Sequence, residues 1–346
     1  MQQIEIPALP VLSQLRSTDA AYPWHVNEAL EKRFSRIYCA TGARPQHIPE
    51  YQEGRGDFHV LAWIAERAFV EARTEVNYEG GADGWDQACG HAARDLGIYR
   101  VMVVPFNGQH QLWRNPNVVK RYADLMMTAD HAYAVADPER DDKRAVVRAL
   151  MDRNVEMLRW GIHGVLPFNP PHRELEGGTA ACLRDARRRS CHILPNLYRE
   201  WERYLAGELK VVRSLQGTDL SNFALLDKPL RMGGHDYATL EHYFQAAKTI
   251  NPEERKFIRD APTPAEAKRR GLHVSMRGDW DSLRLDVMEA GLRKKFAQPR
   301  FAVSLAATGD ALILEGNTWG DQFWGVSKGV GLNKLGRLMM QIRAEM

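Results

Sequence analysis

The sequence predicts an α/β protein of two domains, with a parallel sheet in the N-terminal half and a helix-rich C-terminal half. Its 346 residues exceed what one hydrophobic core usually organises. Short apolar runs alternate with helical periodicity up to about residue 200, whereas helices and loops dominate from about residue 210. We therefore expect a lead-in at residues 1–30, one domain at 31–205 and a second domain at 206–346.

Composition and charge are those of an ordinary globular protein. Hydrophobic residues make up 44% and charged residues 26%, and 47 basic against 44 acidic residues leave a net charge of +3. The four cysteines form no C-x-x-C pair, so neither a disulfide framework nor a zinc knuckle is expected. The N-terminus lacks a signal-peptide pattern, and no apolar stretch is long enough to span a membrane. We expect a cytoplasmic protein that uses no membrane, metal or cofactor.

Strand-like and helix-like segments follow one another through the N-terminal half. The clearest strand is Val101–Val104, which is apolar throughout and is closed by Pro105. Helical spacing of apolar residues is plainest from Phe58 to Arg73. Such alternation is typical of a parallel sheet with helices on its faces. The other predicted strands are 37–40, 76–78, 165–168 and a short one at 193–194, and the other predicted helices lie at 85–96, within 137–155, from about 176 onward, and at 198–210.

Three glycine-containing turns stand at the boundaries of these elements. In an open parallel sheet, ligands bind where the carboxyl ends of strands meet helix N-termini. Glycine lets the backbone approach a phosphate there, and the helix offers free N–H groups. No turn matches a Walker A or a full dinucleotide motif, so two interpretations stay open: tight turns of the fold, or a cradle for a phosphate-bearing ligand. The turns are Thr41-Gly42, Gly80-Gly81-Ala82-Asp83-Gly84 and Gly177-Gly178-Thr179.

The N-terminal half resembles the SLOG superfamily, and within it the YpsA-like branch, over about residues 34–200. The motifs that carry the resemblance are Thr41-Gly42-Ala43-Arg44-Pro45, Gly80-Gly81-Ala82-Asp83-Gly84-Trp85-Asp86, Pro105-Phe106 with Trp113, Arg153-Asn154 with Met157, and Gly177-Gly178-Thr179. The resemblance implies a Rossmann-like sheet and a nucleotide-derived ligand, and it leaves open whether the chain forms a homo-oligomer through this domain. It implies as ligand-binding residues Thr41, Gly42, Arg44, Gly80, Gly81, Asp83, Gly84, Gly177, Gly178 and Thr179. Phosphoribohydrolases of the superfamily have a catalytic glutamate where Cys182 stands here, so the resemblance favours ligand sensing in this half.

A helix expected within residues 237–249 carries the most informative side chains of the C-terminal half. Its Glu241, Phe244, Gln245 and Lys248 share one face by i, i+3, i+4 and i+7 spacing. An acid, an aromatic ring, an amide and an amine on one face indicate a polar site. A solvated helix face is the alternative interpretation.

Several other residues of this half have two interpretations each. Trp280 and Trp324 are either core residues or rings that stack on a base. Asn333 precedes the last predicted helix and is either its N-cap or a ligand contact. The basic cluster Arg293-Lys294-Lys295 either complements a helix dipole or meets phosphates.

These C-terminal segments resemble the NADAR family, also called YbiA-like, over about residues 214–344. The elements that carry the resemblance are Ser221-Asn222-Phe223, Glu241-His242-Tyr243-Phe244-Gln245 with Lys248, Trp280, Asp321 with Trp324-Gly325, and Gly331 with Asn333-Lys334-Leu335-Gly336. The resemblance implies a compact helix-rich α+β domain associated with NAD and ADP-ribose. It implies as catalytic residues Glu241, Asp321 and Trp280, and as substrate-binding residues Asn222, Phe223, Phe244, Gln245, Lys248, Trp324, Gly325 and Asn333.

The family includes two kinds of hydrolase: N-glycosidases that act on phosphoribosylated riboflavin-pathway intermediates, and enzymes that remove ADP-ribose from guanine bases. The YbiA branch has an acidic residue directly after its Trp-Gly pair, where Val326 stands here, and this departure weakens the riboflavin assignment more than the other. Either reaction builds positive charge on the ribose, which a nearby carboxylate stabilises.

We therefore predict hydrolysis of an N-glycosidic bond to ribose in an ADP-ribosyl or phosphoribosyl nucleotide, with ADP-ribosylated nucleic acid as a further candidate substrate. Two alternatives stay open. One is a non-catalytic sensor or sponge of an NAD-derived nucleotide, and the other is a phosphoribohydrolase that acts from the SLOG-like half.

Overall fold

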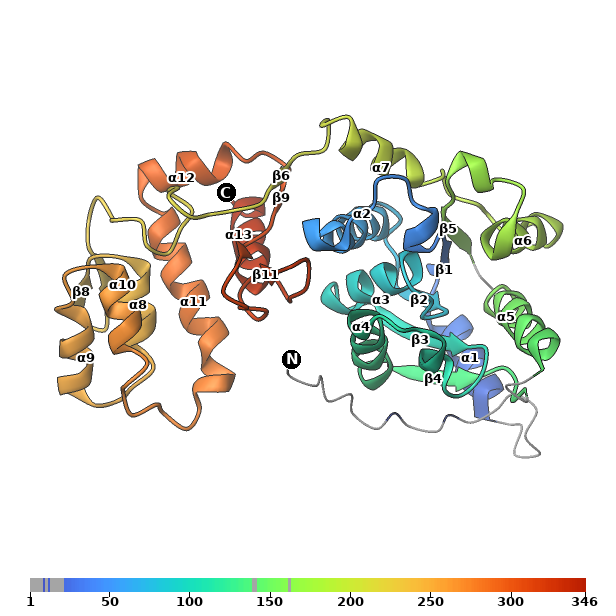
Figure 1. The fold of residues 1–346 in the computed structure, drawn as a ribbon, viewed down its shortest axis with the longest axis horizontal. Helices are drawn as coiled ribbons and strands as arrows, with labels where there is room; N and C mark the ends of the chain where they lie inside the picture. Colours follow the sequence, from blue (N-terminus) through green and yellow to red (C-terminus); the bar gives the residue numbers. More distant parts are fainter. Residues whose placement is uncertain (1–8, 10–11, 13–21, 139–141, 161–162) are drawn as a thin grey trace. The chain divides into compact units, whose positions relative to one another are not determined.

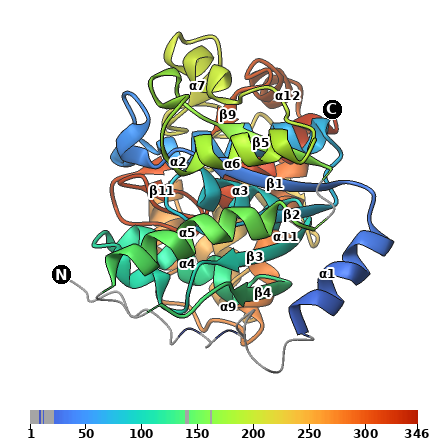
Figure 2. The ribbon, with the colours of Figure 1, turned by 90° about the vertical axis from the view of Figure 1, so that its right-hand side faces the viewer.

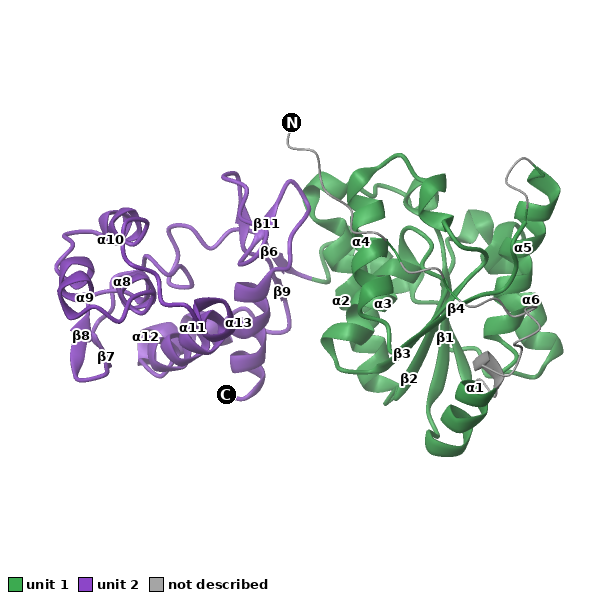
Figure 3. Cartoon of the chain, turned by 90° about the horizontal axis from the view of Figure 1, so that it is seen from below, with its two compact units in different colours: residues 1–209 green, residues 210–346 purple. Residues whose placement is uncertain are grey.

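The computed structural model describes residues 9, 12, 22–138, 142–160 and 163–346. The chain divides into two compact units, which end and begin at residues 209 and 210 (Figure 3). Each unit contains its own hydrophobic core. Most of the expected lead-in, and a few residues of the charged stretch after residue 137, lie outside the described residues.

Unit 1 is built on a five-stranded parallel sheet in the order β4-β3-β2-β1-β5, which confirms the predicted α/β class. Helices α2, α3 and α4 cover one face of the sheet, and α1, α5 and α6 cover the other (Figures 1 and 2). The strands are β1 (Ile37–Gly42), β2 (Val76–Glu79), β3 (Tyr99–Val104), β4 (His131–Ala134) and β5 (Gly164–Phe168). The helices are α1 (Tyr22–Arg33), α2 (Asp57–Glu71), α3 (Trp85–Asp95), α4 (Pro116–Met127), α5 (Lys143–Met157), α6 (Gly177–Arg188) and α7 (Tyr198–Leu205).

Parts of unit 1 differ from the sequence prediction. Helix α1 begins inside the expected lead-in, and it joins the sheet through Leu30, which belongs to the buried core, and through the Asn27 amide, which bonds the hydroxyls of Tyr78 and Tyr133. Strand β4 and helix α4 were not predicted. The strand was missed because it is a short edge strand without an alternating pattern of apolar and polar residues. The strand expected at 193–194 is only an isolated bridge to Val165.

The sheet topology brings the first and the third glycine turns, Thr41-Gly42 and Gly177-Gly178-Thr179, to the same edge of the sheet. Because β1 lies between β2 and β5 and all three are parallel, their carboxyl ends face the same side. Strand β1 ends in Thr41-Gly42, and the backbone N–H of Ala43 then bonds the carbonyl of Phe168. The third turn enters at the same edge because α6 begins with Gly177-Gly178 after β5.

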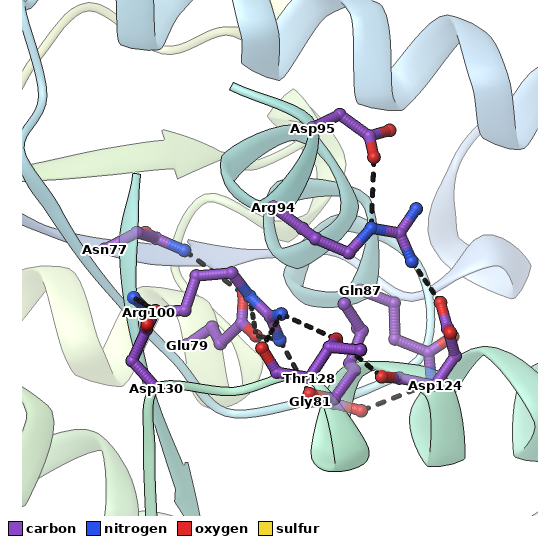
Figure 4. Close-up of polar contacts among 11 residues, drawn as sticks. Asn77, Glu79, Gly81, Gln87, Arg94, Asp95, Arg100, Asp124, Thr128 and Asp130 are labelled. Carbon is purple, nitrogen blue, oxygen red and sulfur yellow. Dashed lines mark hydrogen bonds and ion pairs between the residues drawn. The ribbon is translucent and has the colours of Figure 1, made fainter. Parts of the chain in front are cut away.

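A buried ion pair joins β2 to β3 in the middle of this sheet (Figure 4). The Arg100 guanidinium donates to Glu79 Oε1 at 2.8 Å, and the side chains are 1% and 0% exposed. The same guanidinium donates to the hydroxyl of Thr128, which follows α4, and to the carbonyl of Leu125 in the last turn of α4. Burial raises the pKa of Glu79, and Arg100 opposes this shift. The pair therefore holds two strands and α4 together only while both partners are present.

Unit 2 consists of six helices and three pairs of very short strands. Strands β6 (Val211–Val212) and β9 (Leu312–Ile313) pair in parallel, as do β10 (Gly316–Asn317) and β11 (Val326–Ser327), whereas β7 (Leu230–Met232) and β8 (His235–Tyr237) form a hairpin. The helices are α8 (Leu240–Ala246), α9 (Pro252–Arg259), α10 (Pro264–Arg270), α11 (Trp280–Phe296), α12 (Pro299–Ala306) and α13 (Lys334–Ala344). The predicted helix-rich character of this half is confirmed.

The core of unit 2 joins α8, α11 and α13. Met288, Leu292 and Phe296 of α11 and Leu335 and Met339 of α13 belong to one buried cluster. Both helices therefore present the apolar stripes that their sequences predict. Of the helices that the structure describes, none has the length and apolar character needed to cross a membrane.

We expect Arg100→Met to lower the free energy of unfolding of unit 1 by about 3–5 kcal/mol, because it leaves the Glu79 carboxylate buried without its partner. Glu79→Leu combined with Arg100→Met should recover much of that loss, since no charge then remains in the sheet. Urea unfolding followed by tryptophan fluorescence measures both. Arg148→Met, on the exposed face of α5, is the control, and an equal loss in the control and in Arg100→Met would contradict the prediction.

Candidate active site

Glu241 lies in the first turn of α8 and is only 6% exposed. The helix starts at the Thr239 N-cap, whose hydroxyl accepts the backbone N–H of His242. The backbone N–H of Glu241 donates to the carbonyl of Asn222 at 3.1 Å, which joins the helix start to the Asn222-Phe223 loop. His242 is held away from the site by Thr239 and by the carbonyl of Ala261.

The helix face predicted from spacing is a buried polar face. Gln245 Nε2 donates to Glu241 Oε1 at 2.7 Å, and Lys248 lies half-buried one turn further on. Burial raises the pKa of Glu241, while the hydrogen bond from Gln245 and the charges of Lys268 and Lys248 oppose the shift. Burial also lowers the pKa of Lys248. The solvated-face interpretation is wrong, because Glu241 and Gln245 are both removed from water.

Aromatic rings pack beside this face. The Phe244 ring lies 5.1 Å from that of Trp280 and 5.3 Å from that of Trp324, between ring centroids. Trp280 is 6% exposed and part of the core, so it supports Phe244 from behind. Trp324 is half-buried and contacts Phe323 edge to face, and the guanidinium of Arg284 stacks on Phe323. Of the two predicted tryptophans, Trp324 is the one with a partly open ring.

Asp321 holds the loop that leads into Trp324. Its Oδ1 accepts the backbone N–H groups of Phe323 and Trp324, both at 3.0 Å. The amide of Asn317 bonds both the N–H and the carbonyl of Asp321. One oxygen of this carboxylate is therefore engaged with the backbone, and the other is left for a further contact.

Asn333 and Gly325 fix the neighbouring corner of the chain. Asn333 is 2% exposed and has a left-handed backbone with a φ of 50°. Its Oδ1 accepts the N–H of Glu315 and its Nδ2 donates to the carbonyl of Ile313. At Gly325 a Cβ atom would come within 2.2 Å of the Glu315 carbonyl oxygen. Both residues, expected as substrate contacts, thus act on the backbone of Glu315 in this structure.

Glu315 itself is a candidate residue that the sequence reasoning missed. It lies between β9 and β10, and its Oε2 is buried without a hydrogen-bond partner among the described residues. Burial raises its pKa to about 7, Asp321 adds to the shift, and Lys268 opposes it. One feature of the sequence could have indicated Glu315 as a site residue: an acidic residue follows directly after the apolar run Ala311–Leu314.

Lys268 of α10, also missed, links the two acids. Its charge acts on Glu241 and on Glu315, and its ammonium lies 5.9 Å and 5.2 Å from the ring centroids of Phe223 and Trp319. Around it, buried Asn222 Oδ1, Arg284 Nε and Glu315 Oε2 lack hydrogen-bond partners within the described part of the chain. Buried polar atoms are normally paired, so this arrangement is typical of a site that receives a polar ligand.

Unit 1 holds a separate cavity of about 240 Å³ at the carboxyl edge of its sheet. Six of the predicted ligand-binding residues line it: Thr41, Gly42, Arg44, Gly177, Gly178 and Thr179. The cavity also receives Asp86, Arg153 and Arg173, which were not among the predicted contacts. Arg153 Nη1 lies 3.1 Å from Asp86 Oδ2, and its buried Nε has no partner among the described residues. The cavity thus combines glycine turns with arginines.

The middle glycine turn supports the cavity more than it lines it. Gly80 leaves room for Arg153, since a Cβ there would overlap the guanidinium, and Gly84 packs against the carbonyl of Ala43. Gly81 packs against the side chains of Met102 and Tyr122. Asp83 pairs with Arg121 at 3.5 Å, away from the lining residues. Cys182 is 1% exposed beneath the cavity.

Comparison with known proteins assigns the second unit. The NADAR domain model matches residues 215–346. The N-glycosidase YbiA of Shigella flexneri serotype 5b (strain 8401) is 39% identical over 132 residues, which are 37% of this chain and 81% of that protein. The solved structure of the E. coli protein YbiA shares 33% identity over 40% of this chain and 85% of that chain, with a TM-score of 0.36.

A second solved structure, DNA processing protein A (DprA) from Streptococcus pneumoniae, is 18% identical over 55% of this chain and 63% of that chain, with a TM-score of 0.34. A TM-score this low does not assign unit 1 to a family, so the resemblance to SLOG stays a prediction.

The buried acids of unit 2 and the similarity to YbiA define an enzyme of the glycosidase class. The chain belongs to the NADAR family, whose domain it carries at residues 215–346.

We expect Gly325→Ala to lower the free energy of unfolding of unit 2 by about 1–3 kcal/mol, because the new Cβ would press on the backbone carbonyl of Glu315. Gly278→Ala is the matched control, since a Cβ there meets nothing within 4 Å and its φ is not left-handed. Urea unfolding of both variants measures the difference. Equal losses in the two variants would show that the corner around Glu315 accommodates a side chain.

Proposed function

We propose that unit 2 hydrolyses an N-glycosidic bond to ribose in an ADP-ribosyl or phosphoribosyl substrate, and that unit 1 binds a nucleotide-derived ligand. The observation that carries the first part is the buried carboxylate of Glu241, which lies in the field of Lys248 and Lys268. Cleavage of the bond builds positive charge on the ribose, and a carboxylate removed from water stabilises such charge far better than an exposed one.

Glu241 serves in this proposal as the general base or as the stabiliser of the oxocarbenium ion. Both roles need the ionised form, and a carboxylate whose pKa is raised by burial is also the stronger base toward a water molecule. Gln245 fixes one carboxylate oxygen, so that the other faces the substrate. The free oxygen of Asp321 would hold a ribose hydroxyl.

The remaining groups recognise the ends of the substrate. Lys248 and Lys268 would bind its phosphates, because a compact ammonium is suited to a phosphate oxygen. Phe223, which is 39% exposed, and the half-buried Trp324 would stack on the base or on adenine. Trp280 acts from the core as a support for Phe244. The unpaired oxygen of Asn222 would accept a hydrogen bond from the substrate.

An ADP-ribosyl substrate is favoured over a riboflavin-pathway intermediate. Val326 stands in β11, where the YbiA-like branch has an acidic residue, and it is 6% exposed. A buried apolar side chain offers no charge to a substrate group. Guanine-linked ADP-ribose, free or in nucleic acid, is therefore the first substrate to test.

The proposal for unit 1 rests on its cavity. Arg44, Arg153 and Arg173 surround the Thr41-Gly42 and Gly177-Gly178 turns, a combination suited to phosphate. The position of a phosphoribohydrolase glutamate is occupied by Cys182, which is buried beneath the cavity. We therefore favour ligand sensing over catalysis in this unit.

The test of the hydrolase is Glu241→Gln, which keeps the shape and the partner Gln245 but removes the charge. We expect the rate to fall by roughly 100- to 10,000-fold while ligand affinity is largely kept. Mass spectrometry of products would follow wild type and variant with ADP-ribosylated guanine as nucleoside and in DNA, ADP-ribosylated protein, NAD and phosphoribosylated pyrimidines. Glu253→Gln, on the exposed first turn of α9, is the control.

Loss of turnover in Glu241→Gln alone supports the proposal and identifies the substrate class. If wild type releases neither base nor ADP-ribose from any substrate yet binds one tightly, the hydrolase proposal fails and a non-catalytic sensor or sponge replaces it.

A second prediction concerns the ligand of unit 1. Arg44→Ala should weaken the binding of ADP-ribose by roughly tenfold, since one exposed charge–phosphate contact is worth about 1–2 kcal/mol, and the loss should shrink as salt is raised. Calorimetric titration measures the affinity. Free ADP-ribose carries no bond to a departing base, so it should also bind to unit 2 as a product, and Arg44→Ala should leave that second binding event unchanged. Arg187→Ala, exposed on α6 outside the cavity lining, is the matched control. Equal affinities in the two variants would place the ligand elsewhere.

A further inference from the structure

Glu315 is held in place more firmly than a residue of a loop usually is. Its N–H donates to Asn333 Oδ1 at 2.9 Å, and its carbonyl accepts the N–H of Val326 at 2.7 Å. Gly325 packs directly against its carbonyl and its Cγ. Strand β11 and the Asn333 N-cap of α13 thus hold the backbone of Glu315, and Gly325 packs against the base of its side chain.

The carboxyl group that this corner presents is buried and incompletely bonded. Its Oε2 has no hydrogen-bond partner among the described residues. The charged groups that act on it are Asp321, from the loop between β10 and β11, and Lys268, from α10. The start of α13 contributes only the neutral amide of Asn333. Burial first, and then Asp321, raises the pKa of Glu315 to about 7, so its protonated and ionised forms are both present near neutral pH.

The two acids of the site have different surroundings. Burial raises the pKa of Glu241 as well, but the hydrogen bond from Gln245 and two nearby lysines oppose this shift and favour its ionised form. Glu315 has an acidic neighbour and one lysine, so its protonated form is favoured. Carboxyl groups whose environments separate their protonation states in this way divide the roles of base and acid.

We infer that Glu315 is the proton donor to the departing base in the hydrolysis proposed above, and that Glu241 acts opposite it on the ribose. In this step the C1′–N bond breaks and its electron pair stays on the base nitrogen, which takes the proton of Glu315. The oxygen of a water molecule bonds to C1′, and Glu241 takes a proton from that water. Exchange with solvent then returns a proton to Glu315 and removes one from Glu241. The inference rests on the proposed function.

The test is the pH dependence of kcat/KM with ADP-ribosyl-guanosine as the substrate. Wild type should lose activity as the pH rises through about 7, because Glu315 ionises there. Glu315→Gln should lower the rate by roughly 100- to 10,000-fold and remove this alkaline limb. Glu253→Gln, exposed on α9, should leave both unchanged.

Substitutions at Asp321 and at Lys268 should shift the alkaline limb of the pH profile in opposite directions. A purely structural role of Glu315 would not produce such shifts. Asp321→Asn keeps an oxygen for the Phe323 and Trp324 N–H groups but removes the negative charge, so the alkaline limb should move to lower pH. Lys268→Gln removes the cation that favours ionised Glu315, so the limb should move to higher pH.

The experiment distinguishes failure of the role inferred for Glu315 from failure of the proposed hydrolase function. If Glu315→Gln, shown to be folded by its thermal transition, keeps wild-type turnover and the same alkaline limb, this inference is overturned while the hydrolase proposal stands. The same conclusion follows if Asp321→Asn and Lys268→Gln leave the limb where it is. If wild type does not cleave the substrate at all, the proposed function fails and the role of Glu315 fails with it.

Discussion

Two carboxyl groups are removed from water in unit 2 without a direct ion-pair partner. No ion pair within the described part of the chain involves Glu241 or Glu315, although burial raises the pKa of both. Taking a carboxylate out of water costs several kcal/mol unless it is hydrogen-bonded, neutralised by a nearby charge or protonated. The arrangement of the rest of the site follows from this cost. Lysines stand near enough to influence the acids and too far to pair with them.

Neutral amides hold the site where strands cannot. The strands around it are only two residues long, so their ladders provide few hydrogen bonds. Asn333 and Asn317 replace them by bonding the backbone of 313–315 and of Asp321. Lys295, which is fully buried, donates to the carbonyl of Ser221 at 2.6 Å and has its pKa lowered to about 7 by burial. Lys295 thus holds the loop that carries Asn222 through a hydrogen bond to its backbone.

Sequence reasoning reached the features that depend on local pattern. It predicted the parallel sheet of unit 1, and the shared face of Glu241, Gln245 and Lys248 followed from helical spacing. It missed β4, because four residues of an edge strand carry no periodic signal. It also missed α1, because among the described side chains of that helix only Asn27 and Leu30 are buried, which is too few to form an apolar stripe. Glu315 and Lys268 could not be placed, since the charge of Lys268 acts on Glu241 and on Glu315 only after segments 27 or more positions apart fold together. Spacing along one helix does not contain that information.

The two units use charge in opposite ways. In unit 1 the buried carboxylate Asp86 faces Arg153 at 3.1 Å, and the guanidinium holds it in a fixed pair that leaves a net positive lining for an anion. Such a pair stabilises a bound phosphate but has no free basicity, because the lone pairs and the charge are already engaged. Burial raises the pKa of Asp86 as it raises those of Glu241 and Glu315, but the acids of unit 2 have no such guanidinium partner among the described residues. A raised pKa without a fixed partner favours proton transfer. The two units therefore differ in the partners of their buried acids. Asp86 of unit 1 is bonded to an arginine, whereas Glu241 and Glu315 of unit 2 lie near lysines that form no ion pair with them within the described residues.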